Sequence, residues 1–121
     1  MTDAEKRRRF ERALRFAGDT HTPADVIQKI KDGRARLFDE GETFAVCEVL
    51  VYPRKRFTNV WLTSGTLEDC HVLEPQIVTW AKENECSAMV ATGRMGWQRV
   101  AHQFGWRPQA IKFVKQLTDG A

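Results

Sequence analysis

The chain has 121 residues, of which 42% are hydrophobic, and it includes four tryptophans. This length predicts one domain with a packed core. A net charge of +3 disfavours a protein whose whole surface binds nucleic acid. Three widely spaced cysteines form no CxxC pair, so they predict reduced thiols in a cytoplasm and no metal site. The charged N-terminus and the short apolar runs predict neither a signal peptide nor a membrane span.

Residues 4–17 predict an amphipathic helix, because apolar side chains recur at helical spacing. These side chains are Phe10, Ala13, Leu14 and Ala17. The basic run Lys6–Arg9 could contact phosphate or an acidic partner, although a solvated helix face is the simpler interpretation. A linker follows at residues 18–21. We therefore divide the chain into an N-terminal helix (1–18) and a domain (19–121), and we expect the domain to fold without the helix.

The second helix is predicted to begin after Thr22, which is a good N-cap, and to end at Gly33. Pro23 suits its first position. The side chains expected to face inward are Val26, Ile27 and Ile30.

An antiparallel sheet is predicted next, from strands at 34–38, 43–52 and 57–63. A hairpin loop at 39–42 contains Gly41 and joins the first two strands. Both faces of the second strand are apolar, which favours a sheet covered on both sides.

The main helix is predicted after a loop at 64–69, with a stripe formed by Ile77, Trp80 and Ala81. Pro75 either lies in the first turn of this helix or kinks it. The apolar residues 88–92 predict a central strand beside residues 57–63.

A tight turn at Gly93 and Gly96 then leads into a short helix over 97–104. Gly105 suits a left-handed C-terminal cap, after which Trp106 folds back onto the core. Residues 109–116 alternate like a strand, but their propensity also allows a helix.

Several of these features resemble the GNAT acetyltransferase fold, and in particular small GNAT-like proteins of tailed phages and prophages. The resemblance spans residues 22–117. It rests on Gly33, Glu48–Val49, Trp80–Ala81, Gly93–Arg94, Gly96–Trp97, Arg99, Gly105–Trp106 and Lys115. It implies an α/β fold in which helices cover both faces of a mixed, mostly antiparallel sheet.

The same resemblance implies where acetyl-CoA would bind. GNAT enzymes hold its pyrophosphate on backbone N–H groups at the start of the main helix, an arrangement that suits any anion. The corresponding residues are Thr63, Ser64, Gly65, Thr66 and Leu67. Glu68 and Asp69 follow directly, and their negative charge would repel a pyrophosphate.

A catalytic carboxylate is suggested at Glu48, which interrupts an apolar strand and could take a proton from a substrate amine. The alternative is a strand residue paired with a Lys or Arg. Many GNAT enzymes carry a tyrosine four residues before the Gly-aromatic pair, but Ala101 occupies that position here.

A candidate partner-binding patch combines arginine with tryptophan, a pairing suited to cation–π and protein contacts. Its members are Arg94, Trp97, Arg99 and Trp106. The alternative is a pair of core tryptophans covered by the arginines.

The functional hypothesis is therefore a non-catalytic GNAT-fold protein of a phage or prophage, in the host cytoplasm or the virion. It would bind a phage or host protein, or form part of the particle, and would need no cofactor, metal or membrane. The first alternative is an acetyl-CoA-dependent N-acetyltransferase with an altered phosphate loop. A third reading, a nucleic-acid-associated protein acting through the N-terminal helix, is disfavoured by the mild net charge.

Overall fold

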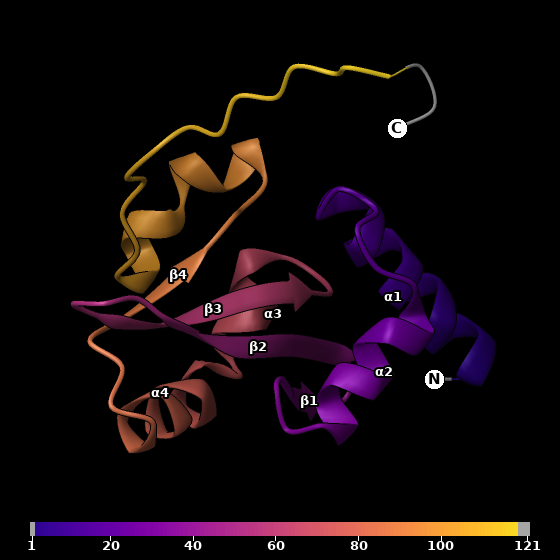
Figure 1. The fold of residues 1–121 in the computed structure, drawn as a ribbon, viewed down its shortest axis with the longest axis horizontal. Coiled ribbons are helices and arrows are strands. Elements are labelled where there is room, and N and C mark those ends of the chain that lie inside the picture. The colour runs from indigo at the N-terminus through magenta and orange to yellow at the C-terminus, as the bar shows by residue number, and fades with distance from the viewer. Residues whose placement is uncertain (1, 119–121) are drawn as a thin grey trace.

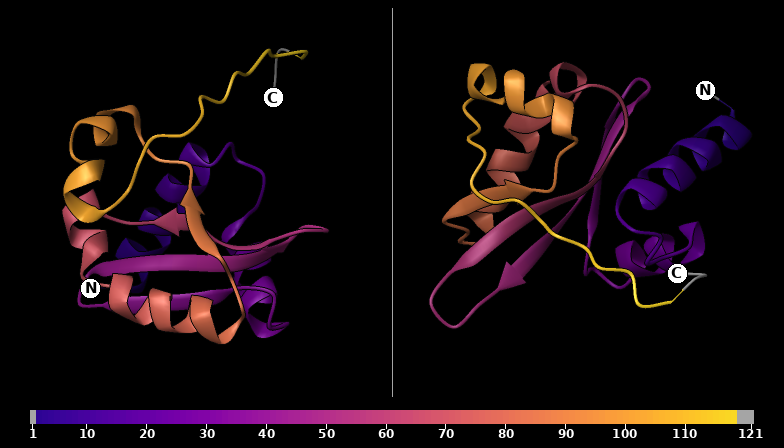
Figure 2. Two further views of the ribbon diagram at one scale, coloured as in Figure 1. Left: turned by 90° about the vertical axis from the view of Figure 1, so that its left-hand side faces the viewer. Right: turned by 90° about the horizontal axis from the view of Figure 1, so that it is seen from above.

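The computed structural model describes residues 2–118 and has helices on both faces of a single sheet (Figures 1 and 2). The four strands are adjacent in chain order: β1 (Arg36–Glu40), β2 (Thr43–Val51), β3 (Arg56–Thr63) and β4 (Ala88–Ala91). Helices α1 (Asp3–Phe16) and α2 (Pro23–Lys31) cover one face, and α4 (Glu74–Glu83) covers the other. The predicted fold class and the covered sheet are confirmed.

The sheet is mixed, as predicted. Strands β1, β2 and β3 pair antiparallel, whereas β3 and β4 pair parallel from Phe57 opposite Ala88 to Val60 opposite Ala91. The predicted contact between these last two strands is confirmed. Among the described residues, however, β4 lies at the edge and not in the centre, because no strand pairs with its outer side.

The first hairpin is tighter than the sequence suggested. Strand β1 begins two residues later than the predicted 34–38 and continues to Glu40, so the turn shortens to Gly41 and Glu42. Gly41 has a φ of 61°, a left-handed conformation that glycine adopts without strain. This register places Phe38 opposite Ala45, and both side chains are buried in the core beneath α4.

Helix α2 begins where it was predicted. Thr22 and Asp25 form a reciprocal capping box, and Pro23 lies in the first turn. Val26 is fully buried, but Ile27 is 50% exposed, so the expectation that it faces inward is wrong. Successive residues of a helix are rotated by about 100°, so Val26 and Ile30 turn toward the sheet together while Ile27 turns away.

Helix α1 contributes directly to the core on its side of the sheet. Ala13 and Leu14 are 5% and 2% exposed, and they join a cluster with residues of α2, β2 and β3. The ring of Phe10 stacks on Phe44, with 4.4 Å between the ring centroids. This packing argues against the expectation that residues 19–121 fold alone.

The single main helix predicted after residue 69 is replaced by two helices. The short helix α3 (Leu67–His71) precedes α4, and Pro75 lies in the first turn of α4, which resolves the question of a kink. Leu73 and Ile77 are buried against the sheet. Trp80 contacts Phe38 edge-on, with 5.7 Å between the ring centroids.

The segment after β4 departs from the prediction in two places. The helix expected over 97–104 is a pair of 3-10 helices, η1 (Met95–Arg99) and η2 (Ala101–Phe104). Gly105 has a φ of 81°, which confirms its role as a left-handed cap. Residues 109–116 form neither a strand nor a helix.

Thr58 of β3 provides a test of core energetics. Its side chain is fully buried, and its hydroxyl has no hydrogen-bond partner among the described residues. Because a buried unpaired hydroxyl is costly, we expect Thr58→Val to raise the free energy of unfolding by about 1 kcal/mol in urea titrations. Thr58→Ser keeps the hydroxyl and removes a methyl group, so it should lower stability. Equal losses in both variants would contradict this reading.

Candidate functional site

An apolar groove lies between β3 and β4 on the face that carries α4, and we call it the β3–β4 groove. Its volume is about 590 Å³. The two strands pair only as far as Val60 and Ala91, so the chain beyond these residues diverges and opens the groove. Helix α3, the start of α4, both 3-10 helices and residues 106–112 complete its walls. Apolar side chains along it include Val60, Leu67, Ile77, Met89, Trp97 and Phe104.

A polar cluster lies on the wall of this groove and centres on Glu74. One carboxylate oxygen of Glu74 lies 2.8 Å from Nδ1 of His71, and the other accepts a hydrogen bond of 2.7 Å from Nε1 of Trp106. The His71 ring also contacts Phe104, with 4.7 Å between centroids. A carboxylate on Nδ1 fixes the imidazole orientation and leaves Nε2 as its second proton-transfer site.

The sequence interpretation missed Glu74 and His71. Their spacing of three residues could have suggested a helical pair, but Trp106 lies 32 residues from Glu74 in the chain. Only the fold brings Trp106 and Glu74 together. Trp106 was predicted to fold back onto the core; it folds back onto α4 through its bond to Glu74 and is half-buried, but it joins neither core cluster.

Three members of the predicted partner-binding patch line the β3–β4 groove: Arg94, Trp97 and Trp106. Arg99 does not line it and is exposed. The guanidinium of Arg94 lies 5.6 Å from the ring centre of Phe16, at the end of α1. Partner binding itself stays a prediction.

Trp97 packs directly over Gly93. A Cβ atom at position 93 would lie 2.8 Å from the Trp97 ring, so glycine is needed there for this close approach. The indole is consequently held against the turn that follows β4 and is half-buried in the groove wall.

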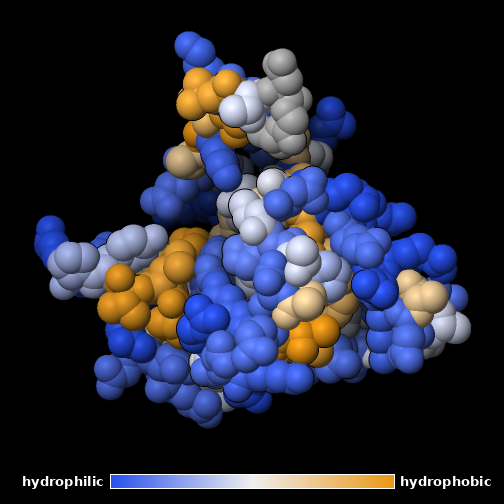
Figure 3. Space-filling model, turned by 45° about the vertical axis from the view of Figure 1, so that its right-hand side comes forward, coloured by the Kyte–Doolittle hydropathy of each residue, from blue (hydrophilic) through white to orange (hydrophobic). Residues whose placement is uncertain are grey.

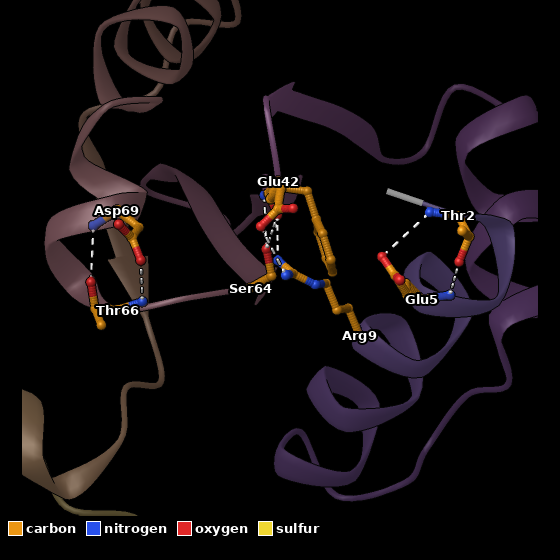
Figure 4. A network of polar contacts seen from close by, with 8 residues as sticks. Thr2, Glu5, Arg9, Glu42, Ser64, Thr66 and Asp69 are labelled. Carbon is orange, nitrogen blue, oxygen red and sulfur yellow. Dashed lines mark hydrogen bonds and ion pairs between the residues drawn. The ribbon is translucent and has the colours of Figure 1, made fainter.

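The segment predicted to hold a pyrophosphate, residues 63–67, is bonded by the carboxylate of Asp69 (Figure 4). Asp69 accepts a hydrogen bond from the backbone N–H of Thr66, and the Thr66 hydroxyl accepts one from the N–H of Asp69. The Asp69 carboxylate also lies against Gly65, where a Cβ would be 2.8 Å from its oxygen. Helix α3 has only five residues, so its dipole is small.

The other predicted members of this segment have different environments. Thr63 and Leu67 line the β3–β4 groove. Ser64 is buried, and its hydroxyl accepts a hydrogen bond of 2.9 Å from the N–H of Phe44 and donates one to the carbonyl of Glu42. This hydroxyl therefore ties the start of β2 to the end of β3.

Glu48 lies on the opposite face of the sheet from the groove. Its carboxylate is 2.5 Å from Nζ of Lys29, and it accepts a hydrogen bond of 3.2 Å from the side chain of Asn59. The Lys29 ammonium is also 4.7 Å from the ring centre of Trp61. Glu48 is thus a half-buried member of an ion pair, which matches the alternative of a paired strand residue.

All three cysteines are free thiols. Burial, together with the nearby charge of Glu48, raises the pKa of Cys47 from 9.0 to about 12. Burial also raises the pKa of Cys70, which lines the groove. Both thiols are therefore protonated at neutral pH and are poor nucleophiles there.

Within residues 2–118, no three His, Cys, Asp or Glu side chains cluster as metal ligands would. No helix in this range is both long and apolar enough to span a bilayer.

Comparisons with solved structures place this arrangement among known folds. A tetramutant of the BH1408 protein of Bacillus halodurans matches with a TM-score of 0.65 at 13% identity, over 95% of this chain and 94% of that one. A probable acetyltransferase matches with a TM-score of 0.62 at 14% identity, over 96% and 92% of the two chains. The ribosomal-protein-alanine N-acetyltransferase of Brucella melitensis matches with a TM-score of 0.52 at 15% identity, over 90% and 94%.

The chain has a GNAT-like fold. At these identities, the likeness establishes the GNAT-like fold and carries no activity with it. No family model and no curated protein sequence matches the chain.

Proposed function

We propose that this GNAT-like chain is non-catalytic and binds another protein through the β3–β4 groove. The observation that carries the proposal is the carboxylate of Asp69 at the start of α3. The GNAT resemblance implies that a pyrophosphate would lie there on free N–H groups. An acidic side chain instead bonds one of these groups, and Glu68 adds a second negative charge. Each like-charge contact at ~6 Å costs on the order of 1 kcal/mol near a protein surface.

The chemistry of the groove supports a protein ligand. Apolar walls combine with two tryptophans and Arg94, and Trp and Arg are the residue types that dominate the binding energy of many interfaces. The ring of Trp97 is anchored on Gly93, so little side-chain entropy is lost when a partner covers it. The fitting partner presents an apolar segment with an acidic group placed for Arg94.

The phage or prophage part of the proposal rests on the sequence resemblance over residues 22–117. In that setting the partner is a phage or host protein, and the chain acts in the host cell or as a particle component.

The alternative is an acetyl-CoA-dependent N-acetyltransferase, and one observation favours it. His71 lines the groove with its imidazole oriented by Glu74, so Nε2 could take a proton from an amine. Glu48 would not serve in this groove, because it lies on the other face of the sheet with Lys29. The nucleic-acid reading is weakened because Arg9 of the basic run already bonds the carbonyl and carboxylate of Glu42 (Figure 4).

Thermal unfolding with acetyl-CoA separates the two functions. We expect 1 mM acetyl-CoA in low salt to leave the melting temperature unchanged. This concentration is about 100 times the dissociation constant of a ligand that binds at about 10 µM. A ligand at about 100 times its dissociation constant would add about 2.7 kcal/mol of stability, and so raise the melting temperature by on the order of 10 °C.

The matched variant is Asp69→Asn, which removes one charge from the start of α3. If acetyl-CoA stabilises the unaltered chain, and Asp69→Asn strengthens the effect, the non-catalytic proposal is wrong. Acetyl transfer to a peptide amine that is lost in His71→Ala would then establish the alternative.

A further inference from the structure

The C-terminal segment, residues 109–117, first lines the β3–β4 groove at residues 109–112 and then runs clear of the body of the protein, as the yellow trace in Figure 1 and the left view of Figure 2 show. Its large apolar side chains are strongly exposed: Ile111 is 70%, Phe113 89%, Val114 69% and Leu117 87% accessible. The apolar atoms at the top of Figure 3 stand clear of the main body. So many exposed large apolar side chains within one short segment favour an interaction site there.

The backbone of this segment is also unpaired. In the described chain, main-chain hydrogen bonds end at Trp106, whose N–H bonds the carbonyl of Ala101. An extended segment with free N–H and C=O groups is suited to join the edge of a sheet. In a strand, one side would carry Ile111, Phe113, Lys115 and Leu117 and is apolar except for Lys115, whereas the other side would carry Lys112, Val114 and Gln116. This alternation suits a strand with one mostly apolar face.

A complementary edge exists on β4. Within residues 2–118, no strand pairs with its outer side. Its sequence is Ala-Met-Val-Ala, without a charge or a proline. Natural sheets normally protect an open edge with charged residues or proline. Because β4 has neither, its edge is expected to be covered by another strand.

We propose that residues 109–117 of one copy pair with the outer edge of β4 of a second copy, giving a two-fold symmetric dimer with exchanged C-terminal segments. Each chain carries both the segment and the β4 edge. A two-fold rotation therefore pairs both segments with both edges, and no segment or edge is left to bind a third copy. Beyond the groove wall the segment runs above its own body and clear of it, which leaves it accessible to another molecule. This proposal does not need the β3–β4 groove to bind another protein, although β4 and residues 109–112 also line that groove.

Light scattering coupled to size exclusion tests the proposal on the full chain. At about 100 µM we expect a mass twice the 13.9 kDa of one chain. Phe113→Lys should weaken the dimer by on the order of a hundredfold or more, because a symmetric interface loses the contact twice. Val90→Lys, which places a charge on the β4 edge, should have the same effect.

The matched control is Ile27→Lys, since Ile27 is a half-exposed apolar residue on α2. This variant should remain dimeric, and melting curves should show all three variants folded. Hydrogen exchange should show slow amides at 109–117 in the dimer and fast ones in Phe113→Lys. A monomeric unaltered chain overturns the proposal, whether its C-terminal amides are fast or, through pairing within one chain, slow. A dimer that survives both Phe113→Lys and Val90→Lys also overturns it.

Discussion

Deletion of residues 1–17 is expected to abolish cooperative unfolding, and Leu14→Ala alone should lower the free energy of unfolding by about 3 kcal/mol. Leu14 is 2% exposed, and its cluster joins α1 to α2, β2 and β3. Without α1, this face of the sheet would expose Phe44 and Val46 to water. Urea titration followed by circular dichroism measures both effects, because loss of the core removes the sharp transition.

The control for this prediction is Arg8→Ala on the exposed side of α1. It should change stability by less than about 0.5 kcal/mol. If the deleted chain still unfolds in a sharp transition with an unchanged midpoint, the division into 1–18 and 19–121 is a true domain boundary, and α1 is an accessory helix.

The sequence predicted α2 and the sheet well because their signals are local. Thr22, Pro23 and Asp25 specify a helix start within four residues, and Gly41 specifies a turn between two apolar runs. The position of α1 was not predictable in the same way. Its apolar stripe indicates a helix with a buried side, but the partner of Phe10 is Phe44, and no local pattern identifies that contact.

The last segment shows a different limit. Residues 109–116 have the alternation of a strand, yet a strand needs a neighbour for its backbone groups, and in the described chain this segment makes no backbone hydrogen bond. The alternation thus indicated that the segment can form a strand. Whether it does so depends on a neighbouring strand that bonds its backbone groups. On our proposal the missing neighbour is β4 of a second copy.

The candidate site was partly predictable. Arg94, Trp97 and Trp106 were selected for their chemistry, and the fold places all three on one groove. Glu74 was missed because an acidic residue in the first turn of a helix is ordinary. Its significance comes from His71 and Trp106, which only the folded chain brings to the two oxygens of its carboxylate.

Glu48→Gln is expected to lower the free energy of unfolding by about 2 kcal/mol. The substitution removes the charge that pairs with Lys29, whose side chain is only 21% exposed and would be left without its anion. Asn59 would also lose a charged acceptor. Urea titration measures the loss, and a double-mutant cycle with Lys29→Met should show coupling between the two positions.

Glu40→Gln is the matched control, since Glu40 is an exposed carboxylate on β1, and it should be nearly neutral. The same experiment separates the two roles considered for Glu48. A catalytic base would lose acetyl transfer on conversion to glutamine while stability stayed the same, because a general base acts on substrate and not on the fold. The ion pair instead predicts that Glu48→Gln lowers the free energy of unfolding. This loss should be smaller in a chain that already carries Lys29→Met. Full stability in Glu48→Gln would therefore remove the structural explanation for this carboxylate.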